Sequence, residues 1–267
     1  MTRTLLKNID NIPALPETVQ EVERIYNDEN STLEDMQKAI NKDPLVTANI
    51  LRIANSPMYG LKTQVTTIKQ ATSLLGRESI RMFVMSSVTD SFDINLAPYE
   101  MNKIEFTTAC DKQLSLMIYW LLRRKPYRLA LLGPAAFLVD IGRVVIAKTL
   151  IEDGKEDIIT QAVNAGEDIA KAEKKACGAQ TTDVTATLFT RWNFNPDIVH
   201  LIRYSDDPEG AVHEDREMAA ELKAVRETIL PNGEITEESI ATAKETIEEF
   251  GLDLISYERS VERLLAS

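Results

Sequence analysis

The 267-residue sequence has few of the residues that build disulfide frameworks and metal centres. It contains two cysteines, Cys110 and Cys177, whose separation matches neither a disulfide framework nor a zinc-binding spacing. Its two histidines, His200 and His213, do not form a pair at ligand spacing. CxxC, HExxH and GxSxG motifs are absent, as are glycine-rich loops that bind phosphates. The sequence therefore excludes a disulfide scaffold and lacks the usual zinc, thiol-redox and serine-hydrolase motifs.

A secretory signal and a long uncharged hydrophobic run are also absent. We therefore expect a cytoplasmic protein whose cysteines act as small buried hydrophobic residues. The most apolar stretch, Leu129 to Leu150, is interrupted by Asp140 and Arg143 and is too short for a membrane span. We predict that it forms a helix inside a helical core, without membrane contact. A buried carboxylate such as Asp140 needs a cation, a metal or backbone amides as its partner.

Charge is unevenly distributed along the chain. The net charge is −12, which argues against broad nucleic-acid binding, because such binding needs a cationic surface. Residues 206–267 hold 17 acidic and 6 basic residues, whereas acids and bases nearly balance in residues 1–205. Pro208 and Gly210 supply turn residues near this junction. We predict a helical domain over 1–205 and an acidic C-terminal extension over 206–267, whose two helices form a hairpin packed on that domain.

The remaining hydrophobic pattern is typical of successive helices, and no stretch has convincing strand character. Ser31 and Glu34 form a candidate capping box, and Asp43 is placed to cap a helix with Pro44 in its first turn. The helix that follows Pro44 is apolar on most sides and should be buried. Thr67 is a candidate cap for a further helix, which Gly76 should end. The fold class predicted by these signals is all-α.

A basic cluster follows the helix expected between Ile104 and Leu122. Its cations favour the negative end of the helix dipole, and they also offer a grip for a phosphate group. Both interpretations remain open at this point. The cluster consists of Arg123, Arg124, Lys125 and Arg128.

Several ordered motifs together resemble the HDOD domain, a bacterial output domain related to the HD superfamily of metal-dependent phosphohydrolases. The most specific is DPLVTANILRIANSPMYG over residues 43–60, which includes Asn55, Tyr59 and Gly60. The others are LPE at 15–17, TTIKQATSLLGRESIR at 66–81, LVDIG at 138–142 and TRWNFNPDI at 190–198. The resemblance covers about residues 9–208 and implies an HD-like multi-helix bundle with a signalling role. Within the first motif we expect Asn55 and Tyr59 to hold the loop by side-chain hydrogen bonds to the backbone.

The resemblance does not extend to the metal ligands. HD enzymes hold their metals with a His-Asp pair and further histidines, whereas Val139 stands at the position of the paired histidine and Asp140 remains. The next histidine position corresponds to Thr181, and the usual His-His-x-Pro ending corresponds to Ser205, Asp206, Asp207 and Pro208. The resemblance therefore implies a degenerate HD site, with no metal and no other cofactor.

Two functions follow from this reading. The first is a non-catalytic signalling module that acts through a protein partner, bound by the helical domain or by the acidic extension. The alternative is a sensor of a nucleotide or phosphate ester, or a residual phosphohydrolase, that uses the degenerate cavity. Arg52, Arg81 and Arg143 are the candidate phosphate contacts for this alternative.

Overall fold

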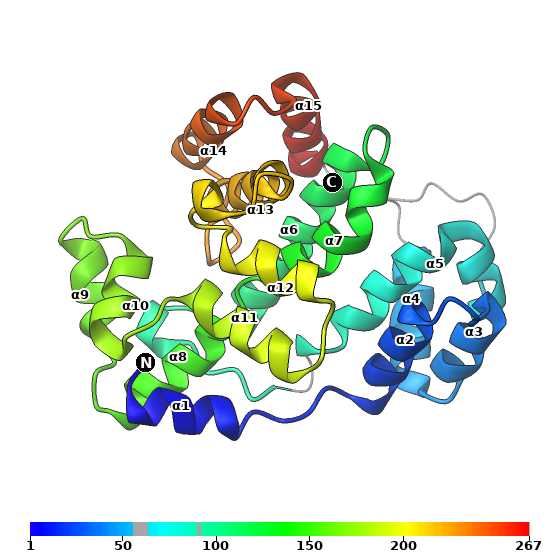
Figure 1. Cartoon of the computed structure of the whole chain (residues 1–267), viewed down its shortest axis with the longest axis horizontal. Helices are drawn as coiled ribbons and strands as arrows, with labels where there is room; N and C mark the ends of the chain where they lie inside the picture. Colours follow the sequence, from blue (N-terminus) through cyan, green and yellow to red (C-terminus); the bar gives the residue numbers. More distant parts are fainter. Residues whose placement is uncertain (56–63, 90–91, 267) are drawn as a thin grey trace. The chain divides into compact units, whose positions relative to one another are not determined.

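A computed structural model describes residues 1–55, 64–89 and 92–266 of the chain. Within these ranges the ordered elements are helices, with one isolated β-bridge between Leu96 and Met101 and no strand (Figure 1). This confirms the all-α prediction. The chain divides into two compact units, one formed by residues 13–92 and the other by residues 1–12 together with 93–266. The division expected at residue 205 is not one of these boundaries.

Among its described residues the smaller unit has four helices, and three of them begin at a side-chain cap. The Asp43 carboxylate accepts hydrogen bonds from the backbone nitrogens of Leu45 (3.0 Å) and Val46 (3.1 Å), and Pro44 occupies the first turn, as predicted. Thr67 caps the next helix, as predicted, because its hydroxyl accepts from the Gln70 backbone nitrogen. The helices are α2 (Glu17–Asn27), α3 (Leu33–Asn41), α4 (Pro44–Ala54) and α5 (Ile68–Ser86).

Two local predictions for this unit need correction, and one is confirmed. The capping box of α3 is formed by Thr32 and Asp35, because the Ser31 hydroxyl instead donates to backbone carbonyls at the end of α2. The prediction for Gly76 is confirmed: its φ of 79° is not helical, so it ends the first segment of α5, and a second helical segment follows this kink. Leu45 is 83% exposed at the start of α4, where only part of the apolar surface faces the core.

Asn55 fastens the end of α4 to the segment before α5. Its side-chain nitrogen donates to the carbonyl oxygens of Leu51 (2.7 Å) and Val65 (2.8 Å), and its side-chain oxygen accepts from the Val65 backbone nitrogen (2.7 Å). The prediction of side-chain to backbone hydrogen bonds is therefore confirmed for Asn55. Tyr59 and Gly60 lie outside the described residues.

The larger unit contains the apolar stretch from Leu129, which is two helices and not one. The first ends at Leu138 and the second begins at Gly142, so Asp140 lies in the turn between them. By length and composition the segment Pro126–Glu152 could cross a membrane, but 89% of its most apolar window is buried in the structure, so it serves as core. The helices of this unit before the C-terminal extension are α1 (Arg3–Asp10), α6 (Lys103–Leu121), α7 (Leu129–Leu138), α8 (Gly142–Glu152), α9 (Ile158–Asn164), α10 (Ile169–Cys177), α11 (Thr181–Arg191) and α12 (Pro196–Arg203), with the 3-10 turns η3 (Ala97–Tyr99), η4 (Pro126–Arg128) and η5 (Pro208–Gly210).

The acidic extension forms three helices, one more than its apolar stripes predict. They are α13 (Arg216–Thr228), α14 (Glu237–Glu249) and α15 (Leu254–Leu265). Helix α13 packs against α6, α7 and α12 as well as α14, and α15 packs against α6. Tyr257 of α15 is fully buried and its hydroxyl shares a hydrogen bond with Thr228 of α13. The extension is thus part of the larger unit's core.

Lys125 and Arg128 of the basic cluster after α6 contact the acidic extension, a role that was not considered from the sequence. Arg128 donates to Glu221 (2.7 Å) and Glu217 (2.5 Å) of α13, and Lys125 contacts the same two carboxylates. Glu221 is almost fully buried at this contact. Lys125 and Arg128 therefore hold the acidic extension, a role that depends on a helix about 90 residues further along the chain.

Candidate functional site

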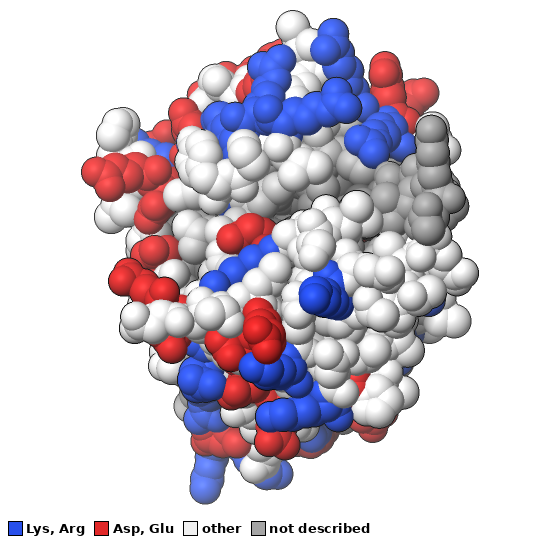
Figure 2. Space-filling model, turned by 90° about the vertical axis from the view of Figure 1, so that its right-hand side faces the viewer, with Lys and Arg blue, Asp and Glu red and all other residues white. Residues whose placement is uncertain are grey.

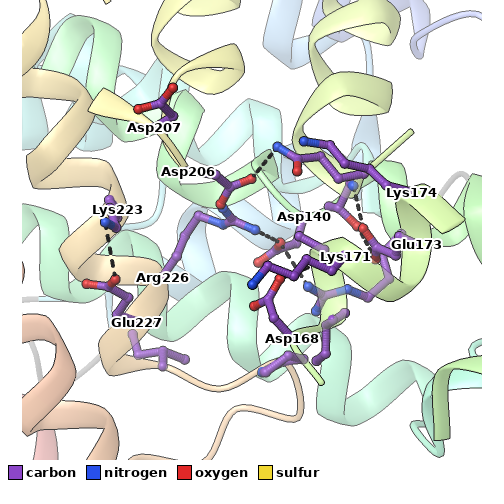
Figure 3. A pocket seen from close by; sticks show the side chains of 17 residues that line it. Asp140, Asp168, Lys171, Glu173, Lys174, Asp206, Asp207, Lys223, Arg226 and Glu227 are labelled. Carbon is purple, nitrogen blue, oxygen red and sulfur yellow. Dashed lines mark hydrogen bonds and ion pairs between the residues drawn. The ribbon is translucent and has the colours of Figure 1, made fainter. Parts of the chain in front are cut away.

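The larger unit contains a cavity of about 460 Å³ beside the turn between α7 and α8. Its walls come from this turn, from the first turns of α10 and α11, from the residues after α12, and from α13 with the segment that follows it (Figure 3). Both acidic and basic side chains line it. Residues from the predicted degenerate site and from the acidic extension therefore meet at one place.

Asp140 enters this wall from the turn and is 5% exposed. Its carboxylate accepts hydrogen bonds from Gln113 (2.9 Å), Arg226 (3.0 Å) and Arg143 (3.3 Å). Burial alone would raise the pKa of Asp140, but the positive charges of Arg226 and Arg143, with the hydrogen bond from Gln113, lower it to about 2. The partner required by this buried carboxylate is therefore a pair of arginines.

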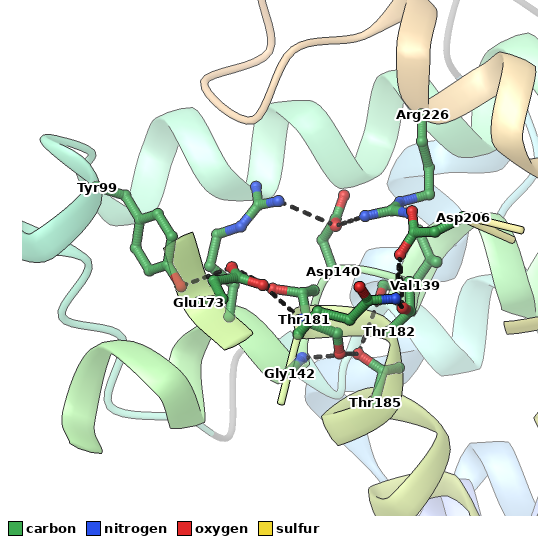
Figure 4. Close-up of polar contacts among 12 residues, drawn as sticks. Tyr99, Val139, Asp140, Gly142, Glu173, Thr181, Thr182, Thr185, Asp206 and Arg226 are labelled. Atoms are coloured by element: carbon green, nitrogen blue, oxygen red, sulfur yellow. Dashed lines mark hydrogen bonds and ion pairs between the residues drawn. The ribbon is translucent and has the colours of Figure 1, made fainter. Parts of the chain in front are cut away.

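Arg226 joins Asp140 and Asp206, the two carboxylates that the sequence predicts for the degenerate HD site. One terminal nitrogen of its guanidinium donates to Asp140 and the other to Asp206 (Figure 4). Asp206 also accepts from the Thr182 hydroxyl (2.6 Å) and the Gln180 amide (2.9 Å). Burial opposes the charged form of Arg226, but the carboxylates of Asp206 and Asp140 outweigh it and raise the pKa of Arg226. The guanidinium is thus held as a cation between them.

Thr181, at the second histidine position, is bound to a buried glutamate. The Glu173 carboxylate accepts from the Thr181 backbone nitrogen (2.6 Å) and hydroxyl (2.7 Å), and from the Tyr99 hydroxyl (2.8 Å). Burial raises the pKa of Glu173, although the charge of Arg143 and these hydrogen bonds counteract part of the increase. The network fixes the start of α11 against α10.

The start of α8 packs closely against α11. The backbone nitrogen of Gly142 donates to the Thr185 hydroxyl (2.9 Å), and that hydroxyl donates to the Val139 carbonyl (2.8 Å). A Cβ atom on Gly142 would lie 2.4 Å from the Thr181 carbonyl oxygen and 2.7 Å from the Thr185 hydroxyl oxygen. Glycine is therefore needed here for close approach, and this approach positions Asp140.

Gly142→Ala is expected to lower the free energy of unfolding by about 1–3 kcal/mol, because the added methyl must push two helices apart. Urea unfolding measures this change. Gly154→Ala is unsuitable as a control because Gly154 has a φ of 64°, so the matched control is Ala130→Gly in α7. Equal stability of Gly142→Ala and the unsubstituted protein would show that the helices are not in such close contact.

The structure brings together some of the sequence-predicted residues and not others. Asp140, Thr181, Asp206 and Arg143 line the cavity. Val139 and Ser205 are fully buried and do not line it. Their surroundings are the core, where the Ser205 hydroxyl donates to the Ile202 carbonyl.

Arg52 and Arg81 belong to the smaller unit and do not line this cavity. Arg52 donates to Asn49 (2.7 Å) within α4. Arg81 is 2% exposed and forms two hydrogen bonds with Glu23 of α2. Both arginines thus stabilise helices of their own unit.

Sequence reasoning missed Arg226, the residue that organises the site. It lies in the acidic extension, and the net negative charge of that segment does not indicate that one of its basic residues is buried. One signal was present: Arg226 stands four residues after Leu222 and three before Ile229, on the apolar face of its helix. A cation at such a position needs a buried acid as its partner. Glu173 was also missed, although it carries the same signal: it stands four residues after Ile169 and three before Ala176, on the apolar face of its helix.

The residues at the HD positions do not fit the metal that HD enzymes use. A divalent cation requires carboxylate oxygens or neutral histidines directed at one point. Both oxygens of Asp140 accept hydrogen bonds from protein groups, and a guanidinium lies between Asp140 and Asp206. Among the described residues, no group of three or more His, Cys, Asp or Glu is arranged to hold a metal.

Comparison with known proteins identifies the family. A family model described as HDOD domain matches residues 12–208. An HDOD domain protein with unknown function from Geobacter sulfurreducens is 20% identical with a TM-score of 0.74, covering 99% of this chain and 92% of that chain. A virulence factor from Campylobacter jejuni is 28% identical with a TM-score of 0.59, covering 96% and 92%. A protein of Shewanella amazonensis proposed to be a phosphohydrolase is 22% identical with a TM-score of 0.72, covering 98% and 94%.

A search of curated protein sequences finds no match. The family model covers well over half of the chain, and the extension that supplies Arg226 lies beyond the matched residues. The chain belongs to the HDOD domain family.

Proposed function

We propose that this protein is a non-catalytic signalling module that acts by binding a protein partner. The observation that carries the proposal is the Arg226 guanidinium, which donates to both Asp140 and Asp206. Hydrolysis by HD enzymes depends on a metal that activates water. In this chain the carboxylates that such a metal would need form ion pairs with a cationic side chain.

The proposal predicts no metal-dependent phosphohydrolase activity. We expect purified full-length protein to contain less than stoichiometric metal, and to hydrolyse neither phosphomonoesters nor cyclic dinucleotides when manganese, iron or magnesium is added. Metal content is measured by mass spectrometry, and turnover by phosphate release and chromatography. The physical reason is that a metal would have to displace Arg226, leaving a buried arginine without a counter-ion.

Two variants make this assay decisive. Asp140→Asn removes the central carboxylate of the site, and Asp93→Asn makes the same chemical change at an exposed position. Stoichiometric metal with turnover that Asp140→Asn abolishes and Asp93→Asn preserves would contradict the non-catalytic proposal and establish the residual phosphohydrolase instead.

The acidic extension is the surface we assign to the partner. On α14, the side chains of Glu237, Glu238, Glu245, Glu248 and Glu249 are exposed, and α14 packs mainly on α13. The molecule is not uniformly acidic: Figure 2 shows lysine and arginine side chains gathered at the top of the drawn face and acidic ones along its left side. A partner with a basic surface would be steered to the acidic helix by charge complementarity.

We expect Glu245→Gln, Glu248→Gln and Glu249→Gln together to weaken partner capture at least fivefold, as measured by quantitative affinity purification from the native cell. These residues lie near the C-terminal end of α14, where removing negative charge does not weaken the helix. The control carries Glu29→Gln, Asp93→Asn and Glu156→Gln, which remove the same charge at exposed positions elsewhere. Equal capture by the two variants would rule out α14 as the binding surface.

A further inference from the structure

Part of the cavity wall consists of buried hydrogen-bond donors that have no acceptor. The Nε and one terminal nitrogen of Arg143 are buried and have no hydrogen-bond partner, and neither has the Nε of Arg226. The Arg143 side chain is 5% exposed, and both arginines line the cavity. A buried charged donor without an acceptor is costly, so this wall favours a group that supplies acceptors.

The carboxylates beside these arginines already accept hydrogen bonds from other groups of the protein. Both oxygens of Asp140 accept from protein donors, and so do both oxygens of Asp206 and of Glu173. Glu227 accepts from the Thr246 hydroxyl and lies 3.8 Å from the Lys223 ammonium. The lining contains six acidic and five basic residues, and none of the acids accepts a hydrogen bond from the unpartnered nitrogens of Arg143 and Arg226.

The first turn of α10 adds a second group of donors to the cavity wall. Asp168 caps this helix by accepting from the Lys171 backbone nitrogen, and Ile169 and Ala170 line the cavity. A helix N-terminus attracts negative charge through its free amides and its dipole. Lys171 and Lys174 project from the same face of α10, are exposed, and lie at the cavity (Figure 3). No ion pair joins either ammonium to a described carboxylate.

From this arrangement we propose that the cavity binds a small organic anion whose phosphate or carboxylate group is held by Arg143 and by the lysines at the start of α10. A volume of about 460 Å³ is within the range of small-molecule sites, roughly 300–1,000 Å³. Ile169, Ile229 and Pro231 provide an apolar edge for the rest of the ligand. Binding needs no metal, and it does not depend on whether the protein also binds a protein partner.

The test is isothermal titration calorimetry on the full-length protein after metals have been removed with a chelating resin, so that no soluble chelator competes as an anion. The probes are inorganic phosphate, adenosine 5′-monophosphate and succinate, with adenosine as the neutral control. We expect one site for at least one anion, with a Kd in roughly the micromolar to millimolar range. The probe that binds most tightly distinguishes a phosphate from a carboxylate ligand. Absence of saturable binding by all three anions, or equal binding of adenosine and its monophosphate, would overturn the proposal.

Two double variants test whether the anion binds at these lysines. Lys171→Gln with Lys174→Gln changes exposed side chains, so folding is preserved, and it should weaken anion binding by roughly fivefold to tenfold. The matched control, Lys148→Gln with Lys175→Gln, removes two exposed lysines that do not line the cavity. The same loss in both variants would mean nonspecific attraction and would overturn the assignment. Because the metals are removed before the titration, this result is independent of the metal-dependent turnover assay.

Discussion

Asp140→Ala is expected to lower the free energy of unfolding by about 3–5 kcal/mol, the usual cost of breaking a buried ion pair by removing one partner. The substitution leaves Arg226 with Asp206 alone and leaves Arg143 without its carboxylate. It also removes the acceptor of the Gln113 amide. Urea unfolding followed by circular dichroism measures the change.

A double-mutant cycle separates the ion pair from the loss of the side chain itself. Arg226→Met keeps the length of the side chain and removes its charge, so Asp140→Ala combined with Arg226→Met should cost clearly less than the sum of the two single changes. Asp93→Ala, at an exposed position, should alter stability by no more than about 0.5 kcal/mol. Additive effects in the cycle would mean that the two side chains do not interact energetically.

The same ion pair predicts how stability changes with pH. The pKa of Asp140 is lowered from 3.8 to about 2, because the charges of Arg226 and Arg143 outweigh burial. A carboxyl group with a lowered pKa in the folded protein contributes stability above its unfolded pKa, and this contribution is lost as pH falls through the folded pKa. The Asp140 contribution, on the order of 2 kcal/mol, should therefore be complete above about pH 4 and should disappear towards pH 2. The stability difference from Asp140→Asn should shrink over this range.

A chain that ends at Ser205 is expected to lose cooperative folding. It lacks α13 and α15, whose buried Leu222, Val225 and Tyr257 pack into the larger unit. Each buried aliphatic side chain contributes about 1.5–3 kcal/mol, and the lost partners of Asp140 and Arg128 add further cost. The total is comparable with the whole stability of a domain, about 5–15 kcal/mol. Calorimetry and near-ultraviolet circular dichroism measure the outcome.

A second truncation, ending at Asn232, retains α13 and therefore Arg226. It should fold, with a lower melting temperature than the full chain, because α15 no longer covers α6. If the chain ending at Ser205 unfolds cooperatively at the temperature of the full-length protein, the extension is an independent appendage. That result would strengthen its interpretation as an arm for a partner.

Local chemistry in the sequence was sufficient to predict the helical class and several helix ends. Helical periodicity, and capping by Asp43 and Thr67, depend on residues within four positions of one another, so they can be read without a structure. The need of Asp140 for a partner was also predictable, since it follows from the cost of burying an unpaired charge.

Only the tertiary structure decided which partner that is. Arg226 lies 86 positions from Asp140 and beyond the residues that match the family, and no sequence spacing relates the two. The break between Leu138 and Gly142 was likewise set from outside the segment, because Thr185 of α11 binds the turn and leaves no space for a side chain at Gly142. Periodicity is a short-range property, whereas the pairing of buried charges and the approach of two helices depend on packing between residues distant in sequence.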